Sequence, residues 1–311
     1  MVGVDPRTPG SARAVVDADA VGGVFVGGKA TAILRDHALS GLRTAAGIPV
    51  AVAVDEEGGR VQRIGALDGS VPSARRMAAT MTPAQVRVLA QRRGARLRAY
   101  GITVDMAPVL DTGSQPDDTV IGDRSFSADP ATVSRYAGAF AAGLRDAGVL
   151  PVFKHFPGHG RASGDSHAGA VTTPALSALR ARDLLPYREL LGGGPAAVMV
   201  GHLEVPGLTD GLPASLSPAA YRLLRTDYGF SGVTITDDLA GMRAISDRYP
   251  LPEAVLAALQ AGADVALSTA TTGVGPVLDR LEAAVADGRL SEADLNSSVA
   301  RVLAAKGYCV R

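Results

Sequence analysis

Eight short runs rich in β-branched residues alternate with longer amphipathic segments, and this rhythm constrains the fold more than any other feature of the chain. A strand, helix, strand order requires parallel pairing with crossover helices, and eight such units are the number that closes a (β/α) barrel. The expected strands are residues 2–4, 22–26, 50–54, 102–106, 150–154, 197–200, 233–236 and 264–267. The expected helices include residues 83–100, 130–147, 175–191, 218–225, 252–261 and 277–286.

We therefore predict an α/β protein, a single (β/α)8 TIM-type barrel that spans residues 1–311 as one domain. The length and the 47% hydrophobic content suffice for one large core, and no linker rich in Pro, Gly and Ser marks a domain boundary. The alternative is an open, doubly wound sheet, although neither a GxGxxG nor a P-loop pattern follows any strand. The opening on a strand suggests that a preceding N-terminal helix or export segment has been removed.

Charge and hydropathy exclude several classes of partner. The chain has 31 acidic and 31 basic residues and no basic patch with interleaved aromatic side chains, so we expect no nucleic-acid partner. No apolar run approaches the roughly 18 residues that span a bilayer. We expect a monomer and interpret the single cysteine, Cys309, as a passive thiol. The Arg- and Ala-rich composition is typical of a high-GC bacterium. Related proteins of such bacteria are often exported lipoproteins of the cell envelope, so we expect one here, without its anchor, rather than a cytoplasmic protein.

Polar groups directly follow four of the expected strands. In a barrel these positions converge on the C-terminal face, where working groups gather. Side chains alternate along a strand, so Asp237 shares one face with the apolar Val233 and Ile235 and is predicted to point into the barrel mouth. The alternative is that an aspartate of this pair caps the following helix. The strand-end residues are Asp55, Lys154, His155, His202, Asp237 and Asp238.

Residues 154–167, KHFPGHGRASGDSH, concentrate three of the five histidines and one of only three lysines in a Gly/Pro-rich loop. In an extended loop Asp165 can accept a hydrogen bond from the imidazole of His167 and fix its tautomer, as in a tuned general acid. A zinc site is the competing hypothesis, with His155, His159, Asp165 and His167 as ligands. The Phe-Pro-Gly between the first two histidines disfavours a helical HExxH-like pair, so we predict no metal.

Two further segments place arginines in the stretches that follow expected strands. A glycine pair within DEEGGRVQR, residues 55–63, allows a tight turn that brings Arg63 toward Asp55. A carboxylate and a guanidinium together accept from and donate to neighbouring hydroxyls, although a surface salt bridge is the alternative. IGDRSF, residues 121–126, places Arg124 in a long helix-free stretch after the fourth strand, and loops of that length are commonly functional.

Four sequence motifs occur in this order along the chain: VDEEGGRVQR, IGDRSF, KHFPGHG followed by DSH, and TDDLAGM. Together they resemble the family 3 glycoside hydrolases, specifically the β-N-acetylglucosaminidases that recycle peptidoglycan, from about residue 20 to residue 305. The resemblance implies an exo-acting, retaining hydrolase that needs no cofactor and releases terminal N-acetylglucosamine from GlcNAc-MurNAc fragments. The alternatives are a phosphorylase or β-glucosidase of the same family, or a catalytically inactive sugar-binding protein.

The resemblance also implies individual roles. Asp237 matches the family nucleophile, His167 matches the acid/base, and Asp165 is the partner of His167. Glu56 stands where the family often has Gln. With 4% aromatic residues and no Trp, the chain lacks stacking platforms for a long cleft, so we expect a short pocket for one terminal sugar. The expected substrate-binding residues are Asp55, Arg63, Arg124, Lys154, His155 and, from its place after the sixth strand, His202.

Overall fold

The computed structural model describes residues 1–307, so Cys309 lies outside the described residues. Eight parallel strands form one sheet, and a parallel bridge between Val2 and Ser268 brings its last strand back to its first. The predicted (β/α)8 barrel is therefore confirmed as a nearly closed barrel. In sheet order the strands are β1 (Val2–Val4), β2 (Gly23–Val26), β3 (Ala51–Val54), β4 (Val104–Asp105), β5 (Leu150–Phe156), β7 (Ala197–Val200), β9 (Thr234–Asp238) and β10 (Val265–Leu267).

Alternation along the strands divides the apolar side chains between two cores. Ten buried residues, among them Ala53, Val152 and Ile235, form a cluster drawn from the strands and their immediate flanks, which fills the barrel interior. Their chain neighbours Val52 and Phe153 belong to a larger cluster between the sheet and the helices. The inner face of each strand is thus fixed by its apolar residues, and polar residues that continue this face enter the barrel mouth.

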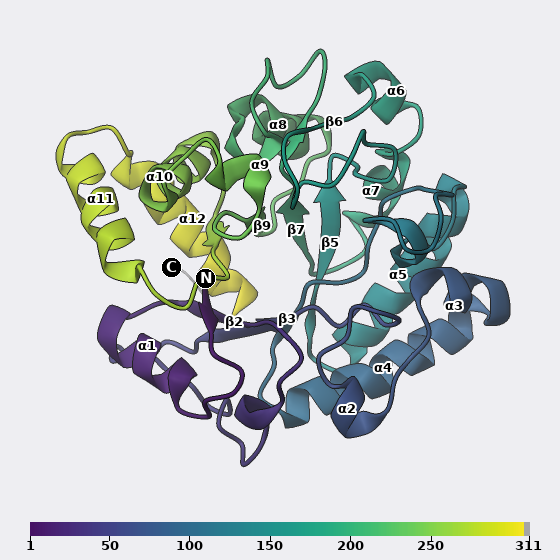
Figure 1. Ribbon diagram of the computed structural model, residues 1–311, viewed down its shortest axis with the longest axis horizontal. Coiled ribbons are helices and arrows are strands. Elements are labelled where there is room, and N and C mark those ends of the chain that lie inside the picture. The colour runs from purple at the N-terminus through teal and green to yellow at the C-terminus, as the bar shows by residue number, and fades with distance from the viewer. Residues whose placement is uncertain (308–311) are drawn as a thin grey trace.

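The helices pack around the outside of the sheet. Figure 1 shows α3, α4 and α5 on one side of the strands and α10, α11 and α12 on the other. Local sequence starts two of the longest helices: Thr82 and Gln85 form a capping box before α4, and the Asp129 side chain accepts the Thr132 N–H at the start of α5. The helices are α1 (Ser11–Asp19), α2 (Gly65–Asp68), α3 (Ala74–Thr80), α4 (Pro83–Ala99), α5 (Pro130–Asp146), α6 (Leu176–Arg180), α7 (Leu185–Leu190), α8 (Pro218–Arg222), α9 (Arg243–Ser246), α10 (Leu251–Ala261), α11 (Val274–Ala286) and α12 (Glu292–Ala305).

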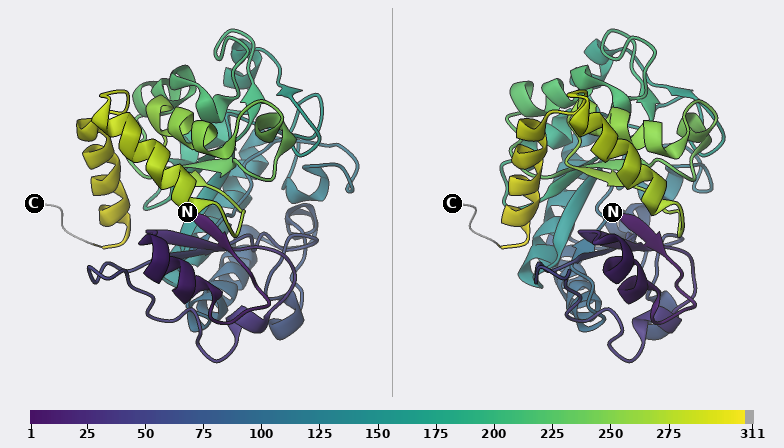
Figure 2. Two further views of the ribbon diagram at one scale, coloured as in Figure 1. Left: turned by 60° about the vertical axis from the view of Figure 1, so that its left-hand side comes forward. Right: turned by 90° about the vertical axis from the view of Figure 1, so that its left-hand side faces the viewer.

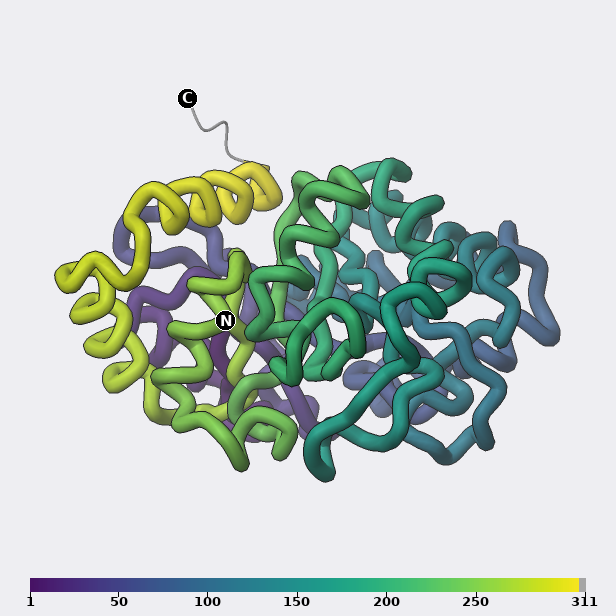
Figure 3. Tube along the Cα trace, turned by 90° about the horizontal axis from the view of Figure 1, so that it is seen from above, coloured from purple at the N-terminus to yellow at the C-terminus, as the bar shows by residue number. Residues whose placement is uncertain are grey.

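The beginning of the chain lies beside its last described helices. Figures 2 and 3 show the purple β1 and α1 on the same half of the molecule as the yellow α11 and α12. The amino group of Met1 donates to the Ala266 carbonyl at 2.8 Å, and Lys306 Nζ donates to the Gly22 carbonyl at 2.7 Å. None of the helices within residues 1–307 is long and apolar enough to cross a membrane.

The fold departs from the predicted elements in three places. Only a 3-10 turn, η1 (Ala32–Leu34), lies between β2 and β3. Two short strands, β6 (Val171–Thr172) and β8 (Leu203–Glu204), form a separate parallel pair that the sequence did not indicate. The single helix expected over residues 175–191 is wrong, because the chain turns between α6 and α7 and buries Asp183, which accepts hydrogen bonds from Thr112 and Arg161.

The packing of α5 on α4 yields a stability prediction. A methyl group added at Gly143 would lie 2.2 Å from the carbonyl oxygen of Arg87 in α4, a backbone atom that cannot move independently. We expect Gly143→Ala to lower the free energy of unfolding by about 1–3 kcal/mol, as overpacked sites do. At Gly138, in the same helix, an added methyl would meet only the end of the flexible Leu190 side chain. Gly138→Ala is the control, and equal denaturation midpoints for the two variants would contradict the prediction.

Candidate active site

The candidate site is a pocket of about 540 Å³ at the C-terminal ends of the strands. Three charged side chains in its lining each lie two positions beyond an inward-facing apolar residue of the same strand: Asp55, Lys154 and Asp237. The register of β5 against β7 shifts near the end of β5, and His155 therefore lines the pocket beside Lys154. Strand alternation and one irregularity thus place four titratable side chains in a common cavity.

Lys154 forms the floor of the pocket. Its Nζ lies 2.8 Å from Asp55 Oδ1 and 2.7 Å from Glu57 Oε1, and its side chain is only 2% exposed. Burial lowers the pKa of Lys154, but the two carboxylates outweigh burial and hold that pKa above its ordinary value. Arg63 Nη2 reaches the other oxygen of Asp55 at 3.0 Å, and Arg124 binds both oxygens of Glu57 at 2.8 and 2.7 Å. The floor is a desolvated network of alternating charges.

His155 is oriented by a buried carboxylate that the sequence analysis did not single out. Its Nδ1 donates to Asp111 Oδ2 at 2.7 Å, while Arg124 Nη2 lies 3.4 Å from its Nε2. Burial raises the pKa of Asp111, but His155 and His159 outweigh burial and lower it. Asp111 is the first charged residue after the apolar stretch that follows the fourth strand, a signal of the same kind that identified Asp55. The sequence analysis also missed Glu57, although Glu57 lies two positions after Asp55 and its side chain therefore points to the same side of the strand.

The two aspartates at the end of β9 have different surroundings. Both line the pocket, and Asp237 Oδ1 accepts the N–H of Asp238 at 2.9 Å. Burial raises the pKa of Asp237, but nearby His155 and His202 and the Asp238 amide outweigh burial and lower it, so the carboxyl is ionised at neutral pH. Asp238 accepts N–H groups from Ala240 and Gly241, which makes it the aspartate that stabilises the turn after the strand.

The pair Asp165 and His167 stands on the long loop between β5 and β6. His167 Nδ1 lies 2.7 Å from Asp165 Oδ1, and the backbone N–H of His167 donates to the same oxygen at 3.0 Å. The two side chains are 44% and 61% exposed, yet His167 lines the same pocket as Asp237. The pocket is therefore bordered by an ionised carboxylate on a strand and a carboxylate-bound imidazole on a loop, with Nε2 of the imidazole left for a ligand.

His202 does not join the pocket lining, in contrast to the other expected binding residues. Its Nε2 donates to the Asp238 carbonyl at 2.9 Å, and its Nδ1 lies 2.7 Å from Ser215 Oγ. Burial lowers the pKa of His202, which keeps the ring neutral. The ring supports the backbone behind the two aspartates and makes no direct contribution to the lining.

The zinc hypothesis lacks a ligand cluster. Within the described part of the chain, no group of three or more His, Cys, Asp or Glu residues is arranged to hold a metal ion. His155 is turned toward Asp111, whereas Nε2 of His159 lies 3.4 Å from Ser166 Oγ. The two rings meet edge to face with their centres 5.9 Å apart, so they do not present nitrogens to a common point.

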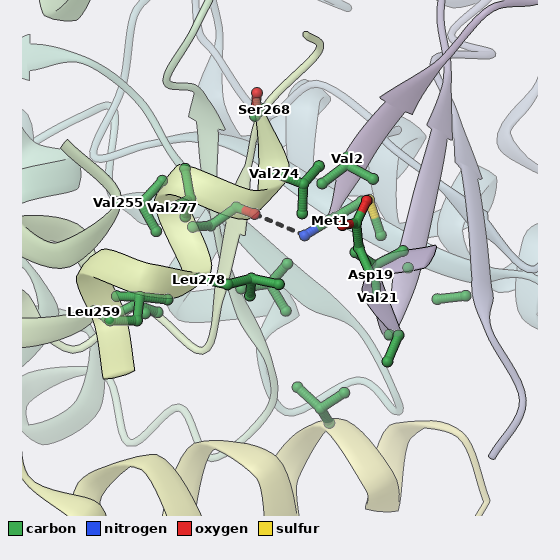
Figure 4. Close-up of a pocket in the computed structure, with 18 of the residues that line it drawn as sticks. Met1, Val2, Asp19, Val21, Val255, Leu259, Ser268, Val274, Val277 and Leu278 are labelled. Carbon is green, nitrogen blue, oxygen red and sulfur yellow. Dashed lines mark hydrogen bonds between the residues drawn. The ribbon is translucent and has the colours of Figure 1, made fainter. Parts of the chain in front are cut away.

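A second cavity has the opposite character. The side chains drawn in Figure 4 line an apolar pocket of about 460 Å³, at the N-terminal ends of β1, β2, β3 and β10. Its walls are mostly Val and Leu side chains from α10, α11 and α12, and Asp264 at its edge is already paired with Arg225 and Arg301. The pocket at the other end of the barrel has the more densely charged lining, with Asp55, Lys154, His155, His167 and Asp237, and it is therefore the candidate for acid-base chemistry.

The matches between this chain and known proteins include all the residues of this site. The model of the "Glycosyl hydrolase family 3 N terminal domain" matches residues 1–305. The beta-hexosaminidase LpqI of Mycobacterium tuberculosis is 56% identical over 314 residues, which cover 99% of this chain and 80% of that protein. A family 3 glycosyl hydrolase from Mycobacterium smegmatis superposes with a TM-score of 0.94 at 54% identity and covers 100% of this chain and 96% of that one. A family 3 beta-N-acetylglucosaminidase from a Paenibacillus species gives a TM-score of 0.90 at 34% identity, covering 99% and 60%.

The charged floor predicts a strong dependence of stability on Glu57. The change Glu57→Gln leaves Lys154 and Arg124 buried with one carboxylate fewer, so we expect the free energy of unfolding to fall by about 3–5 kcal/mol. Glu204 pairs with Arg248 at the surface, and Glu204→Gln should cost no more than about 1 kcal/mol. Urea denaturation of both variants is the measurement, and similar losses would contradict the prediction.

The same variant should change the response to acid. Burial raises the pKa of Glu57, but Arg124 and Lys154 outweigh burial and hold that pKa well below its ordinary value. The stabilisation by Glu57 is therefore complete above the unfolded-state pKa of about 4.3 and is lost as the pH falls toward the lower folded-state pKa. Between pH 6 and pH 3 the free energy of unfolding should therefore fall less for Glu57→Gln than for the unchanged protein. The measurement is the slope of the free energy of unfolding against pH for the two proteins.

Proposed function

Because this chain belongs to glycosyl hydrolase family 3, we propose that it is a retaining β-N-acetylhexosaminidase, which removes terminal N-acetylglucosamine from peptidoglycan fragments. One observation supports the proposal above all others: the ionised Asp237 and the Asp165-bound imidazole of His167 line the same pocket. The names of the M. tuberculosis and Paenibacillus relatives, a beta-hexosaminidase and a beta-N-acetylglucosaminidase, favour an N-acetylated hexosamine as the terminal sugar.

In the first proposed step, a carboxylate oxygen of Asp237 attacks the anomeric carbon and forms a glycosyl ester while the bond to the leaving oxygen breaks. Protonated His167 gives its Nε2 proton to that oxygen, so the leaving group departs as a neutral alcohol. In the second step the neutral imidazole removes a proton from water, and the water oxygen displaces Asp237 from the sugar. Two inversions retain the β configuration, and both groups return to their starting states.

The charged floor is proposed to bind the terminal sugar. Asp55 and His155 offer acceptors to hydroxyl groups, while the guanidinium of Arg63 and the ammonium of Lys154 offer donors. A pocket of about 540 Å³ with no Trp in the chain suits one sugar ring better than a stacked oligosaccharide. These features favour removal of one terminal residue at a time.

The proposed leaving group is a muramic acid derivative, which carries a lactyl carboxylate. A second catalytic carboxylate would repel that anion, whereas an imidazole is positive before proton transfer and neutral after it. The use of His167 in place of an acidic residue therefore supports an anionic leaving sugar.

Turnover of 4-nitrophenyl N-acetyl-β-glucosaminide tests the proposed roles. Asp237→Asn should abolish turnover, because the amide cannot form the ester, and His167→Ala should lower kcat by about 10²–10⁴-fold. Azide should restore turnover of His167→Ala and yield the β-glycosyl azide, since this anion attacks the glycosyl ester without base catalysis. Asp146→Asn, which disrupts a pair with Arg87 on the outer helices, is the control and should keep full activity.

Each alternative gives a different product pattern. N-acetylglucosamine 1-phosphate formed in phosphate buffer would identify a phosphorylase, and faster turnover of the glucoside than of the N-acetylglucosaminide would identify a β-glucosidase. Sugar binding that is unaccompanied by turnover in the unchanged protein would favour an inactive binding protein. Unchanged turnover in Asp237→Asn would contradict the proposed mechanism.

A further inference from the structure

One residue of the Asp165–His167 loop is buried although its neighbours are not. The side chains of Asp165 and His167 are 44% and 61% exposed, whereas Ser166 between them is only 1% exposed. The loop is long and rich in glycine, and a segment of this kind is mobile unless side chains anchor it. Ser166 is therefore the point at which the exposed pair is attached to the body of the protein.

Two contacts hold Ser166. Its carbonyl oxygen accepts the N–H of Ala244, in the short helix α9, at 3.1 Å. Its Oγ lies 3.4 Å from Nε2 of His159, a ring that is 3% exposed. The first contact involves the backbone and survives any substitution of the side chain, whereas the second depends on the hydroxyl group alone.

His159 is itself firmly placed. Its backbone N–H donates to Asp111 Oδ1 at 2.6 Å, and Asp111 is the carboxylate that orients the sugar-facing His155. Within residues 1–307, Nδ1 of His159 has no hydrogen-bond partner, so the contact of Nε2 with Ser166 Oγ is the contact that joins the ring to the loop. Burial lowers the pKa of His159, which favours the neutral form of the ring.

We propose that Ser166 and His159 are positioning residues, and that their contact holds His167 over the pocket in the orientation required for proton transfer. The inference rests on the proposed function, because it assigns the contact to the acid/base group of that reaction. Asp111 then anchors two parts of the site at once: His155 directly and the His167 loop through His159. The wall that binds the sugar and the loop that delivers the proton share a single buried carboxylate.

The proposal predicts a loss that depends on the leaving group. Ser166→Ala keeps the backbone bond to Ala244 but frees the loop to turn, so proton donation by His167 weakens while Asp237 is unaffected. We expect kcat/KM for the phenyl glycoside, whose leaving group needs a proton, to fall by about tenfold or more. The 2,4-dinitrophenyl glycoside leaves without protonation, and its kcat/KM should fall by less than about threefold.

Ser163→Ala is the matched control, because it removes a hydroxyl from the same loop. Ser163 Oγ accepts the N–H of Thr172 at 3.0 Å and belongs to neither proposed contact of Ser166. This variant should leave both values of kcat/KM within about twofold of the unchanged protein, as expected of a substitution at the exposed surface. His159→Gln combined with Ser166→Ala should be no worse than His159→Gln alone, because groups that act through one contact are not additive.

A measurement independent of turnover completes the test. Amide hydrogen exchange over residues 164–168 should become faster in Ser166→Ala and stay unchanged in Ser163→Ala, because local opening sets the exchange rate. Equal losses of kcat/KM on the two glycosides, or unchanged exchange in Ser166→Ala, would each overturn the positioning role. Absence of turnover in the unchanged protein would instead overturn the proposed function, and the exchange data would still decide whether Ser166 anchors the loop.

Discussion

The burial of the Lys154 ammonium between Asp55 and Glu57 is the interaction on which the barrel mouth depends. Removing a charge from water costs several kcal/mol, and only well-placed opposite charges offset that cost. The barrel supplies them because strand alternation sends Asp55 and Glu57 inward from the end of β3 and Lys154 inward from β5. A guanidinium has five N–H donors in a fixed plane, and it would leave several unpaired in this space. A lysine, rare in this chain, meets the two carboxylates with a compact group of three donors.

The same alternation builds a second ion pair outside the barrel. Glu56 lies between two inward-facing carboxylates and therefore points toward the helices, where it is fully buried and bound by Arg93 of α4 at 2.6 Å. Its other oxygen accepts the backbone N–H of Arg63 at 2.6 Å, so a helix on the outer surface fixes the turn that presents Arg63 to Asp55. Glu56 stands where the family often has Gln. A negative charge is tolerated there because Arg93 neutralises it.

The strands and the family could be predicted from the sequence because both leave local signals. Runs of β-branched residues marked all eight barrel strands, and four motifs in order indicated a family that the match over residues 1–305 confirms. Contacts between distant segments could not be predicted in this way. The carboxylate of Asp183 divides the expected helix 175–191 because its partners lie elsewhere in the chain, and the position of Asp111 after the fourth strand does not by itself show that its partner is His155. His202 follows a strand as a pocket residue would, yet its two ring nitrogens bond within the protein.

The two reacting groups of the proposed mechanism need opposite kinds of support. A nucleophile gains from a fixed position, since its attack requires a defined approach to one carbon atom, and Asp237 has this near the end of strand β9. The acid must reach an oxygen that enters and leaves with the substrate, so a group on an exposed loop is better suited to it. An exposed loop of this kind reaches the substrate but holds the acid in a less defined position. Burial of the single side chain of Ser166 between two exposed ones reconciles these demands, because it fixes the loop at one point and leaves the surface around His167 open.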